Sequence, residues 1–201
     1  MPLLTRSVII LFLGAVFVAS APLSARAQAA GTAPDTQMGE APASSALSPA
    51  DRDFIEEAAQ AGHLEVEASQ MALRKSPTLD VKTFAQRMVD EHGEIGQELN
   101  ALASRKGVEA PTEPSLAQKA RLKALDVRDE SFDKAYADEI AVSAHEEAVK
   151  LFDKAAHDDS RDPEIKAFAA SVLPRLQRHL EMGKALQQQV ASKEKAGAKK
   201  P

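Results

Sequence analysis

The chain has 201 residues, a formal net charge of −5 and no cysteine. The absence of Cys excludes disulfides, thiolate metal sites and a lipid anchor on an N-terminal Cys. The lack of a Lys/Arg stripe interleaved with aromatic residues argues against nucleic acid as a partner. Hydrophobic residues make up 44% of the chain but aromatic residues only 4%, so the core consists mainly of small aliphatic side chains, which suits close-packed helices.

Residues 1–27 have the three parts of a secretory signal peptide. Arg6 supplies the positive start, residues 7–19 form an apolar run, and an A-x-A cleavage site ends at Ala27. An uncleaved membrane anchor is the alternative, but the apolar run is short for a span of roughly 20 residues. The sequence therefore predicts a periplasmic or secreted mature chain that starts at Gln28 and has no transmembrane segment.

Two segments of biased composition frame the predicted domain. Residues 28–47 are rich in Ala, Pro, Gly, Ser and Thr and bury too little apolar surface to order themselves, so they are predicted to be a flexible linker. Residues 192–201 are rich in Lys, Ala and Gly and are predicted to be a disordered basic tail. The helical domain is expected to span residues 48–191.

The first two predicted helices form a hairpin. Ser48 and the proline after it are typical of a helix start, and apolar residues recur at helical spacing as far as Ser76. A second helix is predicted to start at Thr78 and to end at Gly107, because Gly is common just after a helix C-terminus.

A long connector, residues 108–130, precedes the second predicted hairpin. It contains a short amphipathic helix whose predicted apolar positions are Leu116, Ala120, Leu122 and Leu125. The third long helix is predicted to start near Ser131. The fourth is predicted to start at Asp162, which is followed by Pro and Glu, and to bend gently at Pro174.

The two predicted hairpins contain a similar short segment. VKTFA at residues 81–85 matches IKAFA at residues 165–169, and each segment opens the second helix of its hairpin. Two helical hairpins joined by a long crossover have the connectivity of ferritin-like bundles. The sequence therefore predicts an all-α, ferritin-like four-helix bundle whose crossover carries a short extra helix.

Four polar residues, one in each long helix, interrupt the apolar stripes: Glu65, His92, His145 and His179. Their spacing from neighbouring apolar residues places each on the core-facing side of its helix. A rise of ~1.5 Å per residue, counted from the hairpin turns, puts all four within roughly 10 Å along the bundle axis. Three imidazoles and a carboxylate form a suitable ligand set for a divalent transition metal, namely Zn, Fe, Mn or Cu.

The same pattern also suits other roles. A hydrogen-bonded layer of His and Glu fixes helix register without binding anything, and the chain is then a non-enzymatic envelope or stress-associated protein. Two facing histidines can also hold a haem or another small ligand. His63 and His157 are expected on the surface. Several acids lie close enough in sequence to fix the tautomers of the inward histidines; these are Glu67, Asp90, Glu91, Asp138 and Glu146.

No catalytic motif is present. The sequence lacks G-x-S-x-G, P-loop, G-x-G-x-x-G and H-E-x-x-H patterns, and no nucleophile stands beside a base in such a pattern. No catalytic residue is therefore assigned. A homo-oligomer and an unidentified partner in the cell envelope both stay open.

Several of these segments resemble a bacterial exported family, the domain of unknown function 4142 (DUF4142). They are GHLEVE at 62–67, VKTFAQRMVDEH at 81–92, AHE at 144–146, LF at 151–152, IKAFA at 165–169, LP at 173–174 and HL at 179–180. The resemblance implies a ferritin-like fold and a place in the cell envelope, and it implies no activity.

The chain departs from the di-iron ferritins in one respect. Those proteins carry Glu-x-x-His on two helices, whereas Val89 and Leu176 stand three residues before His92 and His179. The predicted site is therefore richer in histidine than a di-iron carboxylate site.

Overall fold

The computed structural model describes residues 47–197, which lie within one compact unit. Every regular element in the described part is a helix, which confirms the predicted all-α class. The predicted signal peptide, its cleavage site and the linker up to residue 46 lie outside the described residues, as do residues 198–201.

Helices α1 (Pro49–Lys75) and α2 (Leu79–Arg105) form the first hairpin. The Oγ of Ser48 accepts a hydrogen bond of 3.1 Å from the backbone N–H three residues later and so caps α1. Thr78 precedes α2. Gly107 follows its end with a φ of 68°, a left-handed conformation that favours glycine. The predicted starts and end of this hairpin are therefore confirmed.

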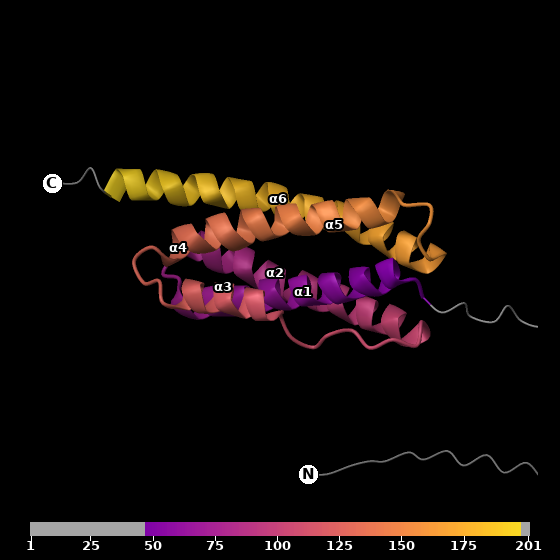
Figure 1. Ribbon diagram of the computed structural model, residues 1–201. Coiled ribbons are helices and arrows are strands. Elements are labelled where there is room, and N and C mark those ends of the chain that lie inside the picture. Colours follow the sequence, from indigo (N-terminus) through magenta and orange to yellow (C-terminus); the bar gives the residue numbers. More distant parts are fainter. Residues whose placement is uncertain (1–46, 198–201) are drawn as a thin grey trace, which may run out of the picture. The chain divides into compact units, whose positions relative to one another are not determined.

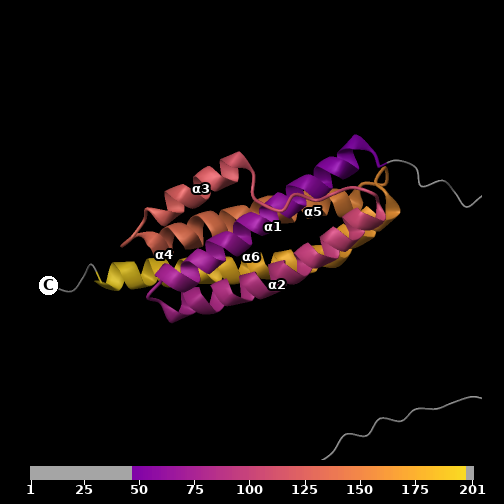
Figure 2. The same ribbon diagram turned by 90° about the horizontal axis from the view of Figure 1, so that it is seen from below.

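The connector carries α3 (Leu116–Asp126), which packs along α1 at the edge of the bundle (Figure 2). Leu122 and Leu125 are buried, as predicted. Leu116 was predicted on the same stripe but is 86% exposed, and Ala120 is exposed too. At 3.6 residues per turn, Leu116 lies about 180° around the helix from Leu125, so the predicted apolar face was too broad.

The third long helical segment of the bundle consists of three consecutive elements (Figure 1). We call this segment and the long helices α1, α2 and α6 the four rods of the bundle. These are α4 (Phe132–Ala135), the π-helix η1 (Tyr136–Ala144) and α5 (His145–His157). The sequence predicted one continuous α-helix from Ser131, and this prediction was wrong in the middle of the rod. Apolar spacing over so few residues does not distinguish i→i+5 from i→i+4 hydrogen bonding.

The π-helix lies very close to the fourth long helix, α6 (Pro163–Gly197). A Cβ added to Gly183 of α6 would stand 1.9 Å from the carbonyl oxygen of Ala141 in η1. Only glycine therefore permits this approach of the two backbones.

Helix α6 begins as the sequence predicted. The Oδ1 of Asp162 accepts a hydrogen bond of 2.9 Å from the backbone N–H of Glu164 and so caps the helix. The helix contains Pro174 and continues to Gly197. Residues 192–197, which composition assigned to a disordered tail, are thus helical in the structure.

Two apolar clusters fill the bundle, one towards each end. The first includes Phe54, Leu99, Phe152 and Leu176. The second includes Met88, Tyr136, Ile140 and Leu186. On the four long rods, a buried layer of Glu65, His92, His145 and His179 separates the clusters.

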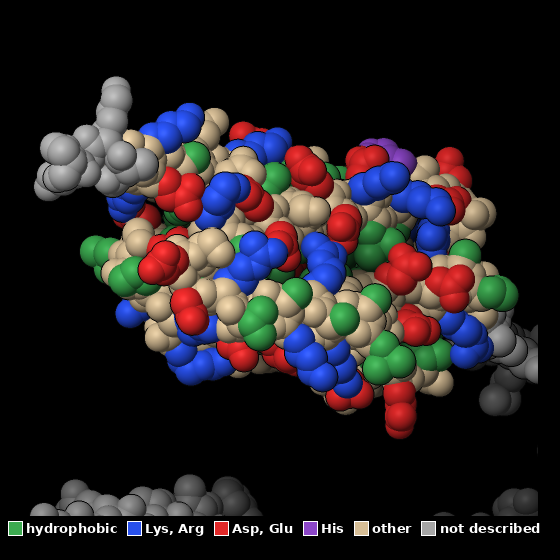
Figure 3. All heavy atoms as spheres, turned by 60° about the vertical axis from the view of Figure 1, so that its left-hand side comes forward, with side chains coloured by type: hydrophobic (Ala, Val, Ile, Leu, Met, Phe, Trp, Pro, Cys, Tyr) green, Lys and Arg blue, Asp and Glu red, His purple; other side chains and the backbone are tan. Residues whose placement is uncertain are grey.

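The surface of the described part is highly charged. Basic and acidic side chains are interspersed on the face shown in Figure 3. Over the described residues as a whole, the large exposed apolar side chains are Leu79, Leu116 and Val127. None of the described helices combines the length and apolar character that crossing a bilayer requires.

Candidate metal centre

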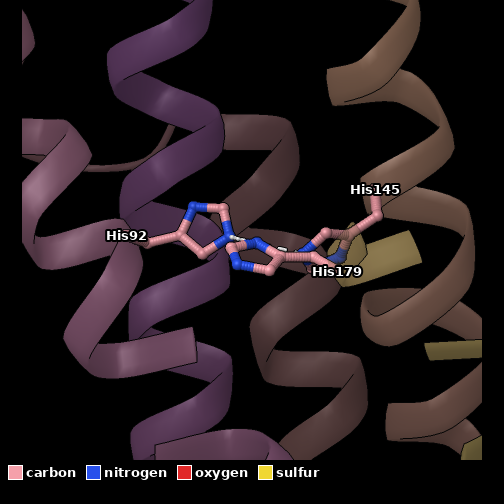
Figure 4. Close-up of side chains that lie close together, drawn as sticks. All are labelled: His92, His145 and His179. Carbon is pink, nitrogen blue, oxygen red and sulfur yellow. Dashed lines mark hydrogen bonds between the residues drawn. The ribbon is translucent and has the colours of Figure 1, made fainter. Parts of the chain in front are cut away.

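The structure brings together the four inward residues predicted from the sequence. Glu65 comes from α1, His92 from α2, His145 from the start of α5 and His179 from α6, and each is at most 3% exposed. The three imidazoles converge from three different rods (Figure 4). Their predicted proximity is confirmed, while their role as metal ligands stays a prediction.

One nitrogen of each imidazole faces the centre of the cluster. The Nε2 of His92 lies 3.3 Å from the Nε2 of His145 and 3.2 Å from the Nδ1 of His179. One potential ligand atom from each of the three histidines lies within 4.8 Å of those of the other two. We call these three atoms the inner nitrogens.

The other ring nitrogens of His92 and His179 face carboxylates. The Nδ1 of His92 is 2.9 Å from the Oε2 of Glu65, and the Nε2 of His179 is 2.7 Å from the Oε2 of Glu91. An ionised carboxylate only accepts hydrogen bonds, so each of these outer nitrogens carries a proton. In the neutral ring the inner nitrogen then bears the lone pair.

The π-helix provides the corresponding partner for His145. Its Nδ1 lies 2.9 Å from the carbonyl oxygen of Ile140, which belongs to η1. A carbonyl also only accepts, so the Nδ1 of His145 donates and its Nε2 presents a lone pair inward. Short π-helical segments often occur at functional sites, and here one holds the orientation of a buried imidazole.

Glu65 stands behind the histidines rather than among the inner nitrogens. Its Oε2 accepts from His92, while its Oε1 is 3.6 Å from the Nδ1 of His145 and has no hydrogen-bond partner within the described residues. Burial raises the pKa of Glu65, but the nearby His92 and His145 outweigh this effect and lower the pKa to about 2. This carboxylate therefore stays ionised.

Burial keeps two of the imidazoles neutral. It lowers the pKa of His145, and the nearby charge of Glu65 only partly offsets this effect. Burial also lowers the pKa of His179 to about 4, against the opposing effect of Glu91. At neutral pH the inner nitrogens of His145 and His179 therefore carry lone pairs and no proton.

Among the acids proposed from sequence to fix His tautomers, Glu91 does so. The others have different surroundings: Asp90 accepts from Gln86, and Asp138 accepts from Lys134 and Gln187. Glu67 and Glu146 are exposed. His157 is exposed as predicted, whereas His63 is only half exposed and its Nε2 lies 3.1 Å from the carbonyl oxygen of Pro111.

The family model of a domain of unknown function, DUF4142, matches residues 36–186. Among solved structures, the bundle is similar to a DUF305 fragment from Deinococcus radiodurans, with a TM-score of 0.61 and 14% sequence identity. That similarity covers 71% of this chain and 98% of the fragment, and at this identity it shows the fold alone. No curated protein matches the sequence.

Proposed function

Because the chain belongs to the DUF4142 family, whose function is unknown, we propose its function from the buried site itself. The bundle binds one divalent transition metal through His92, His145 and His179. The observation that carries the proposal is the uniform orientation of the rings, with an oxygen acceptor at each outer nitrogen and a lone pair at each inner one.

The spacing of the inner nitrogens suits such a metal. Two ligand atoms at 2.0–2.1 Å from a tetrahedral zinc ion lie about 3.3–3.4 Å apart. The inner nitrogen of His92 lies 3.3 Å from that of His145 and 3.2 Å from that of His179. Lone pairs that face each other at this spacing repel, and a cation between them turns the repulsion into attraction.

The charges around the site point to a divalent ion. Imidazole binds a metal in its neutral form and so contributes no charge, while Glu65 and Glu91 contribute two negative charges directly behind two of the rings. Of the metals predicted from the sequence, Zn, Cu and Fe suit imidazole better than Mn, which prefers oxygen ligands. Glu65, which the sequence predicted as a fourth ligand, instead orients His92 in this proposal, and the fourth position stays open to a small molecule.

The position of the centre in the bundle and the predicted export of the chain add to the proposal. The two helical hairpins and the crossover that carries α3 support a ferritin-like arrangement, and the proposed centre lies between the two apolar clusters. The sequence features of residues 1–27 support export of the chain, so the metal would be acquired in the periplasm or outside the cell.

Metal analysis of the purified protein tests the proposal. Protein isolated from its native compartment without an affinity tag should contain close to one equivalent of metal, and a chelator should lower its melting temperature because metal binds only the folded state. His145→Ala should abolish metal binding. His157→Ala, an exposed histidine at the end of the same helix, is the matched control and should bind metal normally.

A structural role for the layer is the competing function, since its side chains already form hydrogen bonds with one another. In that case the chelator has no effect, but His145→Leu still destabilises the fold by roughly 1–3 kcal/mol because the Ile140 carbonyl loses a buried partner. Protein that takes up none of Zn, Fe, Mn or Cu and melts identically with and without chelator rejects the metal proposal.

A further inference from the structure

A cavity of about 190 Å³ lies between α1 and α2 and reaches one of the three proposed ligands. His92, which is 3% exposed, belongs to its wall, while the exposed side chains of Gln97 and Asn100 stand at its rim. The cavity therefore connects the surface of the bundle with the buried histidine cluster. We call it the α1–α2 groove.

Three glycines keep the groove open. A Cβ added to Gly62, Gly93 or Gly96 would meet no atom within 4 Å. Close packing therefore does not require glycine at these positions, and larger side chains there would project into free space. Glycine inside a helix costs roughly 1 kcal/mol relative to alanine, so three of them along one groove reduce helix stability while leaving the passage unfilled.

A second histidine lines the same groove. His63 is half exposed, and its Nε2 is 3.1 Å from the carbonyl oxygen of Pro111 in the crossover segment. When Nε2 donates to this carbonyl, the Nδ1 of His63 carries a lone pair that can bind a cation. The groove thus has an imidazole near the surface as well as the buried imidazole of His92.

We propose that the α1–α2 groove is the route by which the divalent transition metal enters and leaves the centre, and that His63 is its first, transient ligand. The inference rests on the proposed function. An ion exchanging water for an imidazole at His63 and then passing to His92 keeps the same ligand type at both steps, which suits metals that prefer nitrogen donors.

A second cavity, of about 200 Å³, is the competing route. It lies between α1 and α5, and its wall includes Glu57, Ala61, Glu65 and Glu147. Its acidic residues attract cations, although Glu147 is paired with Arg121 at 3.1 Å. The cavity reaches the cluster at Glu65, which accepts from the proton-bearing nitrogen of His92. Its lining residues include no histidine, so an entering ion would meet no nitrogen ligand there before the centre, and this route is less suitable for metals that prefer nitrogen donors.

Two adjacent positions of α1 allow a matched test, because Gly62 lines the α1–α2 groove and Ala61 lines the other cavity. Metal-free protein is mixed rapidly with Zn²⁺, and binding is followed with a chromophoric chelator in competition. Gly62→Leu should slow both uptake and release by about tenfold or more, a barrier increase of at least ~1.4 kcal/mol. The dissociation constant should stay unchanged, since obstruction alters neither end state. Ala61→Leu should change neither rate by more than about twofold.

Two further variants complete the experiment. His63→Ala should slow uptake several-fold at unchanged affinity, while His157→Ala should not. Circular dichroism and melting temperature verify folding, and Gly96→Leu, in the same groove, replaces Gly62→Leu if that variant does not fold. Unchanged rates in the groove variants, or slowing by Ala61→Leu alone, overturn the route. A wild-type protein that binds no Zn²⁺ instead rejects the metal centre itself, so the two failures are distinguishable.

Discussion

At the scale of single residues, ring orientation decides what the cluster can do. Helical periodicity was enough to predict that Glu65, His92, His145 and His179 face inward. It could not show which nitrogen of each ring faces the centre, because this depends on side-chain torsions and on the separation of the helices. Nor could periodicity single out Glu91 among the acids able to orient a histidine. Glu91 lies beside His92 in sequence but accepts a hydrogen bond from His179 on another rod.

The role of Glu65 gives a prediction at this scale. Glu65→Gln keeps the size of the side chain and an oxygen that accepts from His92, but it removes a charge behind the ring. We expect the metal affinity to fall about 10–100-fold, the usual effect of losing such a supporting carboxylate. Competition with a chelator of known affinity measures the change.

Glu67→Gln is the matched control, because Glu67 is exposed two residues further along the same helix. It should leave the affinity unchanged. Complete loss of metal from Glu65→Gln would instead identify Glu65 as a direct ligand, as the sequence predicted. An affinity equal to that of the wild type would remove it from the centre.

At the scale of elements, local signals predicted the helix ends well. Ser48 and Asp162 cap the first and last long helices, and Gly107 ends the second. The π-helix could not be predicted, because its existence depends on a neighbouring rod. Helix α6 accommodates it only where Gly183 lets the carbonyl of Ala141 approach, and this tertiary contact leaves no local sequence pattern.

Substitution of this glycine tests the contact. Gly183→Ala would place a methyl group 1.9 Å from the carbonyl oxygen of Ala141, so one backbone must move. We expect a loss of stability of about 1–3 kcal/mol, typical of overpacking a close-packed core. Urea denaturation measures it.

Gly93→Ala provides the comparison, since it makes the same chemical change in α2 where a Cβ meets no atom within 4 Å. Alanine is the better helix former, so this variant should gain up to about 1 kcal/mol. If both variants gained stability alike, α6 and η1 would not be in the close contact that the structure shows.

At the scale of the whole molecule, a polar layer divides an otherwise apolar bundle. Apolar periodicity identified the four long helical segments and their connector, because each buries one continuous stripe. The fate of residues 192–197 was harder to predict. Their composition resembles that of a disordered tail, whereas the structure extends α6 through them, with Lys193 2.7 Å from Asp80 of the first hairpin.

The buried layer should make the stability of the metal-free protein depend on pH. Burial lowers the folded-state pKa of His179 from 6.5 to about 4 and also lowers that of His145. Between pH 6.5 and 4 the unfolded chain therefore binds more protons than the folded one, and stability must fall as the pH falls. For His179 alone the loss approaches roughly 3 kcal/mol at pH 4. Glu65, whose folded pKa is about 2 instead of 4.5, adds a further loss below pH 4.5.

Urea unfolding in the presence of chelator, repeated from pH 7.5 to 4, measures this dependence. In His179→Gln the free energy of unfolding should fall less steeply between pH 6.5 and 4. Without the titrating ring, unfolding takes up nearly one proton fewer. His157→Ala, which removes an exposed imidazole, should follow the wild type. Equal slopes in the wild type and His179→Gln would mean that His179 takes up its proton as readily in the folded bundle as in the unfolded chain. Protons would then occupy the lone pairs of the inner nitrogens, and the electrostatic argument for a metal among them would fail.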